Sequence, residues 1–184
     1  VVGRLIGQGG YGEVHEVTGP DGERRAMKVT KIREQRDKKA FHRFLGEAHA
    51  LTKIDSPHVV RCDGFGVTPA GFLYLLLEYV EGASLRKVIQ RGPLPVDRAM
   101  RIYRQILRGL HDAHCSGVVH RDIKPENVML GPNSFVKLLD FGICKLDDVS
   151  MHTSTLVATP AYAAPDYLNN DDNERIDVRW ELYS

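Results

Sequence analysis

The sequence predicts an α+β fold in two lobes, a small antiparallel sheet with one helix followed by a mainly helical lobe. Apolar runs separated by turn residues fill most of the first eighty residues, and apolar positions between 41 and 51 recur at helical spacing. After position 95 an apolar face persists for about twenty residues, which is typical of a long helix. We expect one lobe in residues 1–80 and a second, incomplete lobe in residues 81–184.

The composition is that of an ordinary globular chain. The 184 residues are 42% hydrophobic and 27% charged, with a net charge of +1. A charge so close to zero gives no support for a nucleic-acid partner or a membrane-surface binder. The three cysteines are widely spaced, which favours a reducing compartment. No apolar run is long enough to span a bilayer, so no membrane tether is visible, and the sequence does not indicate an oligomeric state.

A glycine-rich stretch lies between the first two expected strands. Its spacing is Gly-x-Gly-x-x-Gly-x-Val. A dinucleotide-binding fold would begin a helix here, whereas a turn cluster at 18–22 leads into another strand. Glycines let backbone N–H groups approach phosphates closely; the alternative is a flexible hairpin turn. The stretch comprises Gly7, Gln8, Gly9, Gly10, Tyr11, Gly12, Glu13 and Val14.

The third expected strand, residues 25–29, carries Lys28, and the helix after it carries Glu47. Taken alone, Lys28 is more often a solvated surface group. Glu47 falls at the edge of the apolar face of its helix and so points inward, where a carboxylate needs a cation. We expect that cation to be Lys28, and the alternative is Arg43, one helical turn back. The apolar face comprises Phe41, Phe44, Leu45, Ala48 and Leu51.

Two further strands, residues 59–67 and 72–79, complete a five-stranded sheet. Ser84 is expected to cap a short helix that ends at Gly92, and Pro95 suits the first turn of a long helix that ends at Gly117. We expect the methionine and aromatic side chains of the long helix to belong to the core. Its expected apolar face comprises Val96, Ala99, Met100, Tyr103, Leu107, Leu110 and Ala113.

The segment from His120 to Asn127 places a carboxylate, an ammonium and a carboxamide in six positions, and a second carboxylate, Asp140, follows. Apolar runs at 128–130 and 136–139 flank the turn residues 131–134, which predicts a β-hairpin. The hairpin would bring Asn127 and Asp140 together at its open end. Two oxygen-bearing side chains there suit Mg²⁺, which takes few protein ligands, and a nearby Asp122 could accept a proton from an alcohol.

These motifs, in this order, resemble the catalytic domain of eukaryotic-type serine/threonine protein kinases, and the composition resembles bacterial members of that family. The match covers the glycine-rich stretch, Ala-Met-Lys at 26–28, His-Arg-Asp-Ile-Lys-Pro-Glu-Asn at 120–127 and Asp-Phe-Gly at 140–142. The resemblance implies ATP as phosphoryl donor, Mg²⁺ as cofactor with Mn²⁺ also possible, and serine or threonine hydroxyls of proteins as acceptors.

The resemblance also assigns roles to single residues. Asp122 accepts the hydroxyl proton, Lys124 neutralises the transferring phosphoryl group, and Asn127 and Asp140 hold the metal. His120 is structural and packs under Phe141. Leu77 forms the back wall of the adenine pocket. The backbone of Glu78 and of Val80 bonds the adenine edge. The implied ATP-binding residues are Gly7, Gln8, Gly9, Gly10, Tyr11, Gly12, Val14, Ala26, Lys28, Glu47, Leu77, Glu78, Val80 and Met129.

The segment after Asp140 resembles a kinase activation segment. A phosphate there would hold the guanidinium of Arg121, beside the catalytic acid; the alternative is plain loop polarity. Three positions depart from the family pattern, Ala158 for glycine, Asp166 for glutamate and Glu181 for aspartate, and they affect scaffolding more than phosphate handling. The candidate phosphorylation sites are Ser150, Thr153, Ser154 and Thr155.

Two alternatives stay open, a pseudokinase that acts as a nucleotide-binding scaffold and a small-molecule phosphotransferase of related fold. Lys28, Asp122, Asn127 and Asp140 argue against the first, and the peptide-platform pattern at 158–166 argues against the second. We expect a cytoplasmic enzyme or the cytoplasmic domain of a membrane-anchored kinase. Both ends of the sequence fall inside expected elements, so we also expect residues 1–184 alone to show little turnover.

Overall fold

A computed structural model of the chain describes residues 2–9, 12–33 and 38–141. Five antiparallel strands form the first sheet, in the order β1-β2-β3-β5-β4. Their bounds are β1 Val2–Gly9, β2 Gly12–Thr18, β3 Arg24–Arg33, β4 Cys62–Val67 and β5 Phe72–Glu78. The predicted five-stranded antiparallel sheet is therefore confirmed.

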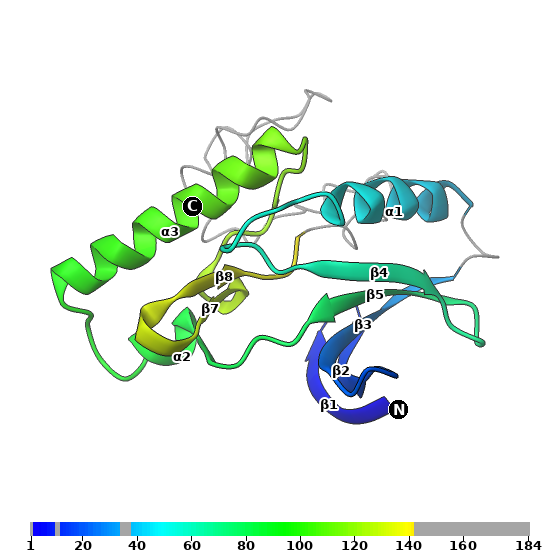
Figure 1. Ribbon diagram of the computed structural model, residues 1–184, viewed down its shortest axis with the longest axis horizontal. Coiled ribbons are helices and arrows are strands. Elements are labelled where there is room, and N and C mark those ends of the chain that lie inside the picture. Colours follow the sequence, from blue (N-terminus) through cyan, green and yellow to red (C-terminus); the bar gives the residue numbers. More distant parts are fainter. Residues whose placement is uncertain (1, 10–11, 34–37, 142–184) are drawn as a thin grey trace, which may run out of the picture.

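One helix, α1 (Lys38–Leu51), packs on this sheet near β4 and β5 (Figure 1). Ala40, Phe44, Ala48 and Leu51 are buried along one side of the helix, which matches the 3.6-residue period of the sequence. The ring of Phe44 meets that of Phe65 edge to face at 6.5 Å. The helix thus closes the apolar face of the sheet, as predicted.

The second part of the chain contains a three-stranded sheet, in the order β6-β7-β8, and two α-helices (Figure 1). The predicted hairpin is confirmed, because Val128 pairs with Leu138 and Leu130 with Val136 in an antiparallel register. The bounds are β6 Ala83–Ser84, α2 Leu85–Ile89, α3 Val96–Cys115, β7 Val128–Leu130 and β8 Val136–Leu138. Short 3₁₀ turns cover Pro125–Asn127 and Pro132–Ser134.

The caps of α2 and α3 agree in part with the prediction. Ser84 caps α2, and its side chain accepts a hydrogen bond from the backbone N–H of Lys87. Pro95 is the N-cap of α3 and not its first helical residue. At the other end of α3 the chain leaves the helix through Gly117, whose φ of 74° is in the left-handed region.

The predicted core face of α3 is confirmed only in its second half, where Leu110 and Ala113 are buried. Val96, Met100 and Tyr103 are 77%, 46% and 49% exposed. The helix packs on β8 through Ile102, Gly109, Leu110 and Ala113, a buried stripe that shares its last two residues with the predicted face. Gly109 favours this packing, because a Cβ there would lie 2.9 Å from a methyl group of Leu138 and 3.1 Å from the carbonyl oxygen of His58.

The predicted strand at 59–67 begins later than expected, at Cys62. The residues just before it join the second sheet. Val60 N–H donates to the carbonyl of Leu138 at 2.9 Å, and Leu138 N–H donates to the carbonyl of His58 at 2.8 Å. The backbone between α1 and β4 is thereby tied to β8, the strand that leads to Asp140.

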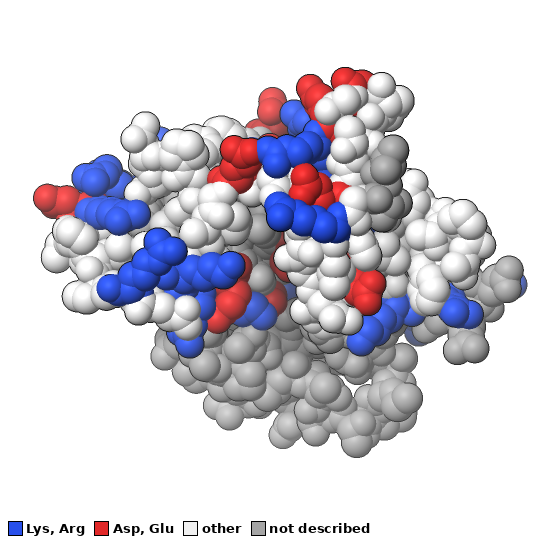
Figure 2. Space-filling model, turned by 90° about the horizontal axis from the view of Figure 1, so that it is seen from below, with Lys and Arg blue, Asp and Glu red and all other residues white. Residues whose placement is uncertain are grey.

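Acidic and basic side chains alternate over the strands of the first sheet, and Figure 2 shows both signs side by side on that face. Arg25 on β3 bonds Asp21 and Asp63, with its Nε 2.9 Å from an oxygen of Asp63. Arg24 pairs with Glu81, which follows β5. Exposed pairs of this kind contribute about 0–1 kcal/mol each, so they keep the outer face soluble more than they stabilise the fold.

Candidate active site

The glycine-rich stretch joins β1 to β2 as predicted. Gly12 has a φ of 152°, and a Cβ there would lie 2.0 Å from the carbonyl oxygen of Val29, so this position requires glycine. The side chain of Gln8 donates to Glu13 at 3.2 Å across the two strands. The expected roles of Gly10 and Tyr11 lie outside the described residues.

Lys28 and Asp140 meet although they are far apart in the sequence. The Nζ of Lys28 on β3 lies 2.7 Å from an Oδ1 oxygen of Asp140, which follows β8. The lysine side chain is 12% exposed and the aspartate side chain 43%. This ion pair joins the first sheet to the second, so the two sequence motifs converge on one site.

The predicted partner of Glu47 was wrong. Its Oε1 accepts from Nη1 of Arg121 at 2.8 Å, while Lys28 is paired with Asp140. An inward carboxylate needs a cation, and Arg121 takes the place expected for Lys28. Arg43, the alternative, attracts the carboxylate more weakly than Arg121 does. Burial raises the pKa of Glu47 above its ordinary value, and the attraction of Arg121 opposes that shift.

Asp122, Lys124 and Asn127 form one hydrogen-bonded group. The Oδ2 of Asp122 lies 2.8 Å from the Nζ of Lys124 and 2.9 Å from the Nδ2 of Asn127. The same Nδ2 also donates to the backbone carbonyl of Asp122. Because both acceptors contact the amide nitrogen, Oδ1 of Asn127 is the atom that can reach a cation.

The backbone holds Asn127 beside the residues that follow β8 and lead to Asp140. The N–H of Leu139 donates to the carbonyl of Asn127 at 2.8 Å. The ring of His120 contacts the carbonyl of Leu139 at 2.7 Å and packs against Phe141 at 4.4 Å. The predicted packing of His120 is therefore confirmed: this fully buried ring supports the segment that presents Asp140.

The oxygens of Asn127 and Asp140 fit a magnesium site. Mg²⁺ prefers hard oxygen ligands and usually takes only one or two from the protein, with phosphates and waters as the others. Mn²⁺ accepts the same ligands. Within residues 2–9, 12–33 and 38–141, no cluster of three or more His, Cys, Asp or Glu side chains forms a metal site by itself. Such a pair therefore suits a metal that arrives with phosphates.

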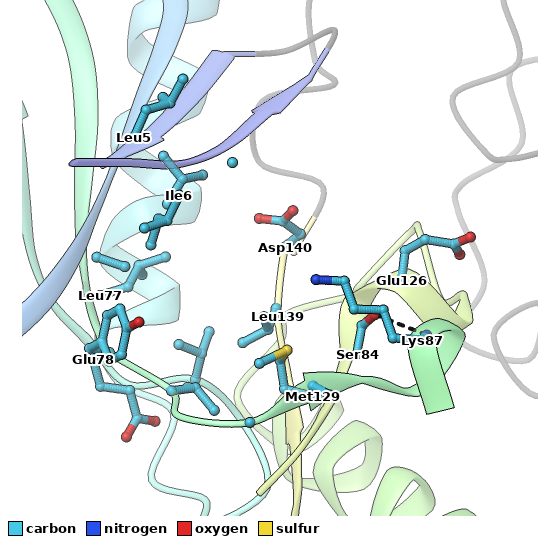
Figure 3. Close-up of a pocket in the computed structure, with 18 of the residues that line it drawn as sticks. Leu5, Ile6, Leu77, Glu78, Ser84, Lys87, Glu126, Met129, Leu139 and Asp140 are labelled. Carbon is cyan, nitrogen blue, oxygen red and sulfur yellow. Dashed lines mark hydrogen bonds between the residues drawn. The ribbon is translucent and has the colours of Figure 1, made fainter. Parts of the chain in front are cut away.

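A cavity of about 630 Å³ lies between the first sheet and the β6–β8 sheet (Figure 3). Leu77 and Ile6 approach it from the first sheet, and Met129 and Leu139 from the second, so its inner part is apolar. Asp140 lies at one end of the space, where the Lys28 pair is formed. The predicted residues that line it are Gly7, Val14, Ala26, Leu77, Glu78, Val80, Met129 and Asp140.

Other predicted residues surround this cavity without belonging to its wall. Lys28 reaches it through Asp140, whereas Glu47 pairs with Arg121, which is also outside the wall. The remaining described residues of the prediction that fall outside the wall are Gln8, Gly9, Gly12, Asp122, Lys124 and Asn127.

The sequence reasoning missed several residues of the wall. Ile6 directly precedes the glycine stretch and Leu139 directly precedes Asp140, so adjacency to a motif could have indicated both. Glu126 lies inside the 120–127 motif and could have been indicated too, whereas Ser84 and Lys87 have no such signal. They reach the cavity only because α2 and the turn at Pro125–Asn127 lie beside each other.

A five-stranded sheet with one helix, joined to a second part across a ligand-sized cavity, is the protein-kinase-like fold. Solved structures share it, among them the following two. The kinase domain of Mycobacterium tuberculosis PknI superposes with a TM-score of 0.75 at 28% identity, over 100% of this chain and 67% of that one. Rad53 1–466 in complex with AMP-PNP gives a TM-score of 0.73 at 27% identity, over 91% and 42%.

The sequence agrees with the fold. A model of the protein kinase domain family matches residues 1–184. Serine/threonine-protein kinase pkn3 of Myxococcus xanthus is 35% identical over 192 residues, which cover 98% of this chain and 35% of that protein. PknB of Mycobacterium leprae is 34% identical over 191 residues, which cover 100% and 30%. The chain belongs to the protein kinase domain family and spans about a third of these curated relatives.

In the part of the chain that the structure describes, every helix is too short or too polar to cross a bilayer.

Proposed function

We propose that this chain is the catalytic domain of a protein serine/threonine kinase, which transfers the γ-phosphoryl group of ATP to serine or threonine hydroxyls of proteins. The observation that carries the proposal is the 2.7 Å contact between Lys28 and Asp140, which joins the phosphate-binding strand to the metal-binding segment. Family membership and relatives named as serine/threonine-protein kinases support the same conclusion.

Each of the site residues named below has a specific task in the proposed reaction. The apolar cavity holds the adenine, with Ala26 on the sheet side and Met129 on the other. Lys28 orients the α- and β-phosphates. Asn127 and Asp140 hold Mg²⁺, which when bound neutralises charge on the phosphates. Phosphoryl transfer depends mainly on such positioning and neutralisation, so these groups suffice for the phosphate side of the reaction.

On the acceptor side, the carboxylate of Asp122 takes the proton of the substrate hydroxyl. The hydroxyl oxygen bonds to the γ-phosphorus, the bond to the bridging oxygen breaks, and ADP leaves. Lys124, 2.8 Å from Asp122, is placed to neutralise the phosphoryl group during transfer. Lys124 and Asn127 both contact the Oδ2 of Asp122, and together these two contacts orient the carboxylate of Asp122.

Activity would be regulated through the activation segment. A phosphate on one of the candidate sites, Ser150, Thr153, Ser154 or Thr155, supplies an anion that can pair with Arg121. The guanidinium of Arg121 already binds one anion, the carboxylate of Glu47. We expect alanine at 153–155 to lower the turnover of the full-length protein. Unchanged turnover would remove this part of the proposal. The cytoplasm, where ATP is available, is the compartment that fits this function.

The test of the proposed function is transfer of radiolabelled phosphate from ATP to a generic basic protein by the full-length protein. Asp122→Asn should lower the rate roughly 10²- to 10⁴-fold, because the proton acceptor is lost, while ATP binding stays within about twofold. Asp97→Asn makes the same change at an exposed acid in the first turn of α3 and should have no effect. ATP binding without transfer in the wild type would indicate a nucleotide-binding scaffold instead.

A further inference from the structure

A lysine that the resemblance does not assign lies in the wall of the cavity. Lys87 is the third residue of α2, and the bond from its backbone N–H to the Ser84 side chain, at 3.4 Å, fixes the start of that helix. Figure 3 shows its side chain extending from α2 into the cavity, with the ammonium pointing toward Asp140.

The carboxylates around this ammonium are already paired. Asp140 accepts from Lys28, and Glu126, which also lines the cavity, lies 3.4 Å from the Nε of Arg86. Among the residues that the structure describes, the Nζ of Lys87 has no hydrogen bond or ion pair. An ammonium directed into a ligand-sized space, with its neighbouring acids paired to other cations, is available to an anionic ligand.

The position of Lys87 indicates which part of a nucleotide it would meet. The apolar end of the cavity, with Leu77 and Met129, suits the flat base, and the Lys28–Asp140 pair marks the far phosphates. Lys87 approaches the space between them from α2, whereas Lys28 approaches from β3. We propose that Lys87 binds the phosphate chain of the nucleotide, so that two lysines from the two parts of the fold hold it. This inference rests on the proposed nucleotide-binding function.

The proposal is tested by calorimetry. The affinities of the full-length protein for ATP, ADP and adenosine are measured, each with magnesium chloride present. Lys87→Met keeps the apolar stem and removes the charge. It should lower the affinity for ATP and ADP roughly three- to tenfold and leave the affinity for adenosine within about twofold, because adenosine has no phosphate. Lys87→Arg should restore most of the ATP affinity, since the cation is restored.

Lys53→Met is the matched control, because it makes the same change at an exposed lysine that lies outside the cavity wall. It should change none of the three affinities. Equal weakening of ATP and adenosine by Lys87→Met would overturn the proposal in favour of a ribose contact, and unchanged ATP affinity would overturn it in favour of a solvated lysine. A wild type that fails to bind ATP would instead refute the proposed function.

Discussion

At one end of the cavity Ala26, Leu77 and Leu139 present apolar surface, whereas at the other Lys28 and Asp140 are joined at 2.7 Å. The apolar end selects by shape, because its residues need only be the right size and face inward. The polar end depends on particular atoms, since each carboxylate or amide there has a fixed partner. It follows that a substitution at the polar end should lower the rate of phosphoryl transfer, while one at the apolar end should lower the affinity for the nucleotide.

Of substitutions at the two ends of the cavity, the largest effect on turnover is expected from Asp140→Asn, which tests the role of the polar end. The change keeps the size of the side chain but replaces the charge that Lys28 contacts, which is also the charged one of the two proposed metal ligands, with a neutral amide. We expect the turnover number of the full-length protein to fall roughly 10²- to 10³-fold, and the magnesium concentration for half-maximal rate to rise. Wild-type turnover in this variant would contradict the proposed role of the polar end.

Asp63→Asn provides the control for that experiment. Asp63 is also paired with basic side chains, Arg25 and Arg61, but on the outer face of the first sheet. The same chemical change there should leave turnover within about twofold, because Asp63 and both of its partners lie outside the cavity wall.

The apolar end is tested by Ala26→Phe. A ring at this position would occupy space that the proposed adenine needs, so ATP should bind roughly tenfold more weakly or worse. Ala26→Gly leaves that space open and should bind ATP almost as the wild type does. Calorimetry on both variants separates the two outcomes. If the phenylalanine variant bound ATP normally, the base would have to lie elsewhere.

A charged pair on β8 also joins the two sheets. The Nζ of Lys137 contacts Glu78 at 2.5 Å and the carbonyl of Val59 at 3.1 Å, and both charged side chains are about one-fifth exposed. A double-mutant cycle with Lys137→Met and Glu78→Gln should give a coupling energy of about 1 kcal/mol, measured as the free energy of unfolding in urea. A coupling near zero would mean that this pair does not join the two sheets energetically.

The smallest expected effect concerns Glu47. Burial raises its pKa in the folded protein above the ordinary value of 4.5, so folding favours its protonated form. The stability that Glu47 contributes relative to Glu47→Gln should therefore be highest in acid and decline as pH rises from about 4.5 through the raised pKa. Urea unfolding of both proteins across this range is the measurement. A difference that grows with pH would mean that the attraction of Arg121 outweighs burial.

Much of the polar end could be predicted from the sequence. Asp122, Lys124, Asn127 and Asp140 stand at spacings that a short loop and hairpin bring together, and local hydrogen bonds of the backbone do so. The sheet followed in the same way from alternating apolar residues and turn clusters. These features depend on residues close in sequence or on a motif order, which a single chain displays directly.

The partner of Glu47 and the buried face of α3 could not be predicted in this way. A buried carboxylate pairs with whichever cation the folded chain brings nearest, and here Lys28 is held by Asp140 while Arg121 is close. The buried stripe of α3 keeps Leu110 and Ala113 of the predicted face, but before them it runs through Ile102 and Gly109. The close approach of Gly109 to Leu138 is a contact between segments far apart in the chain.

The sequence by itself thus determined the fold class, the order of the motifs and the chemical types of the groups that handle phosphate, because those depend on spacing and on local structure. The tertiary structure alone decided which charges pair, which helix face is buried and that Lys87 points into the cavity. These outcomes depend on distances between segments far apart in the chain, and such distances are set only when the whole core has packed.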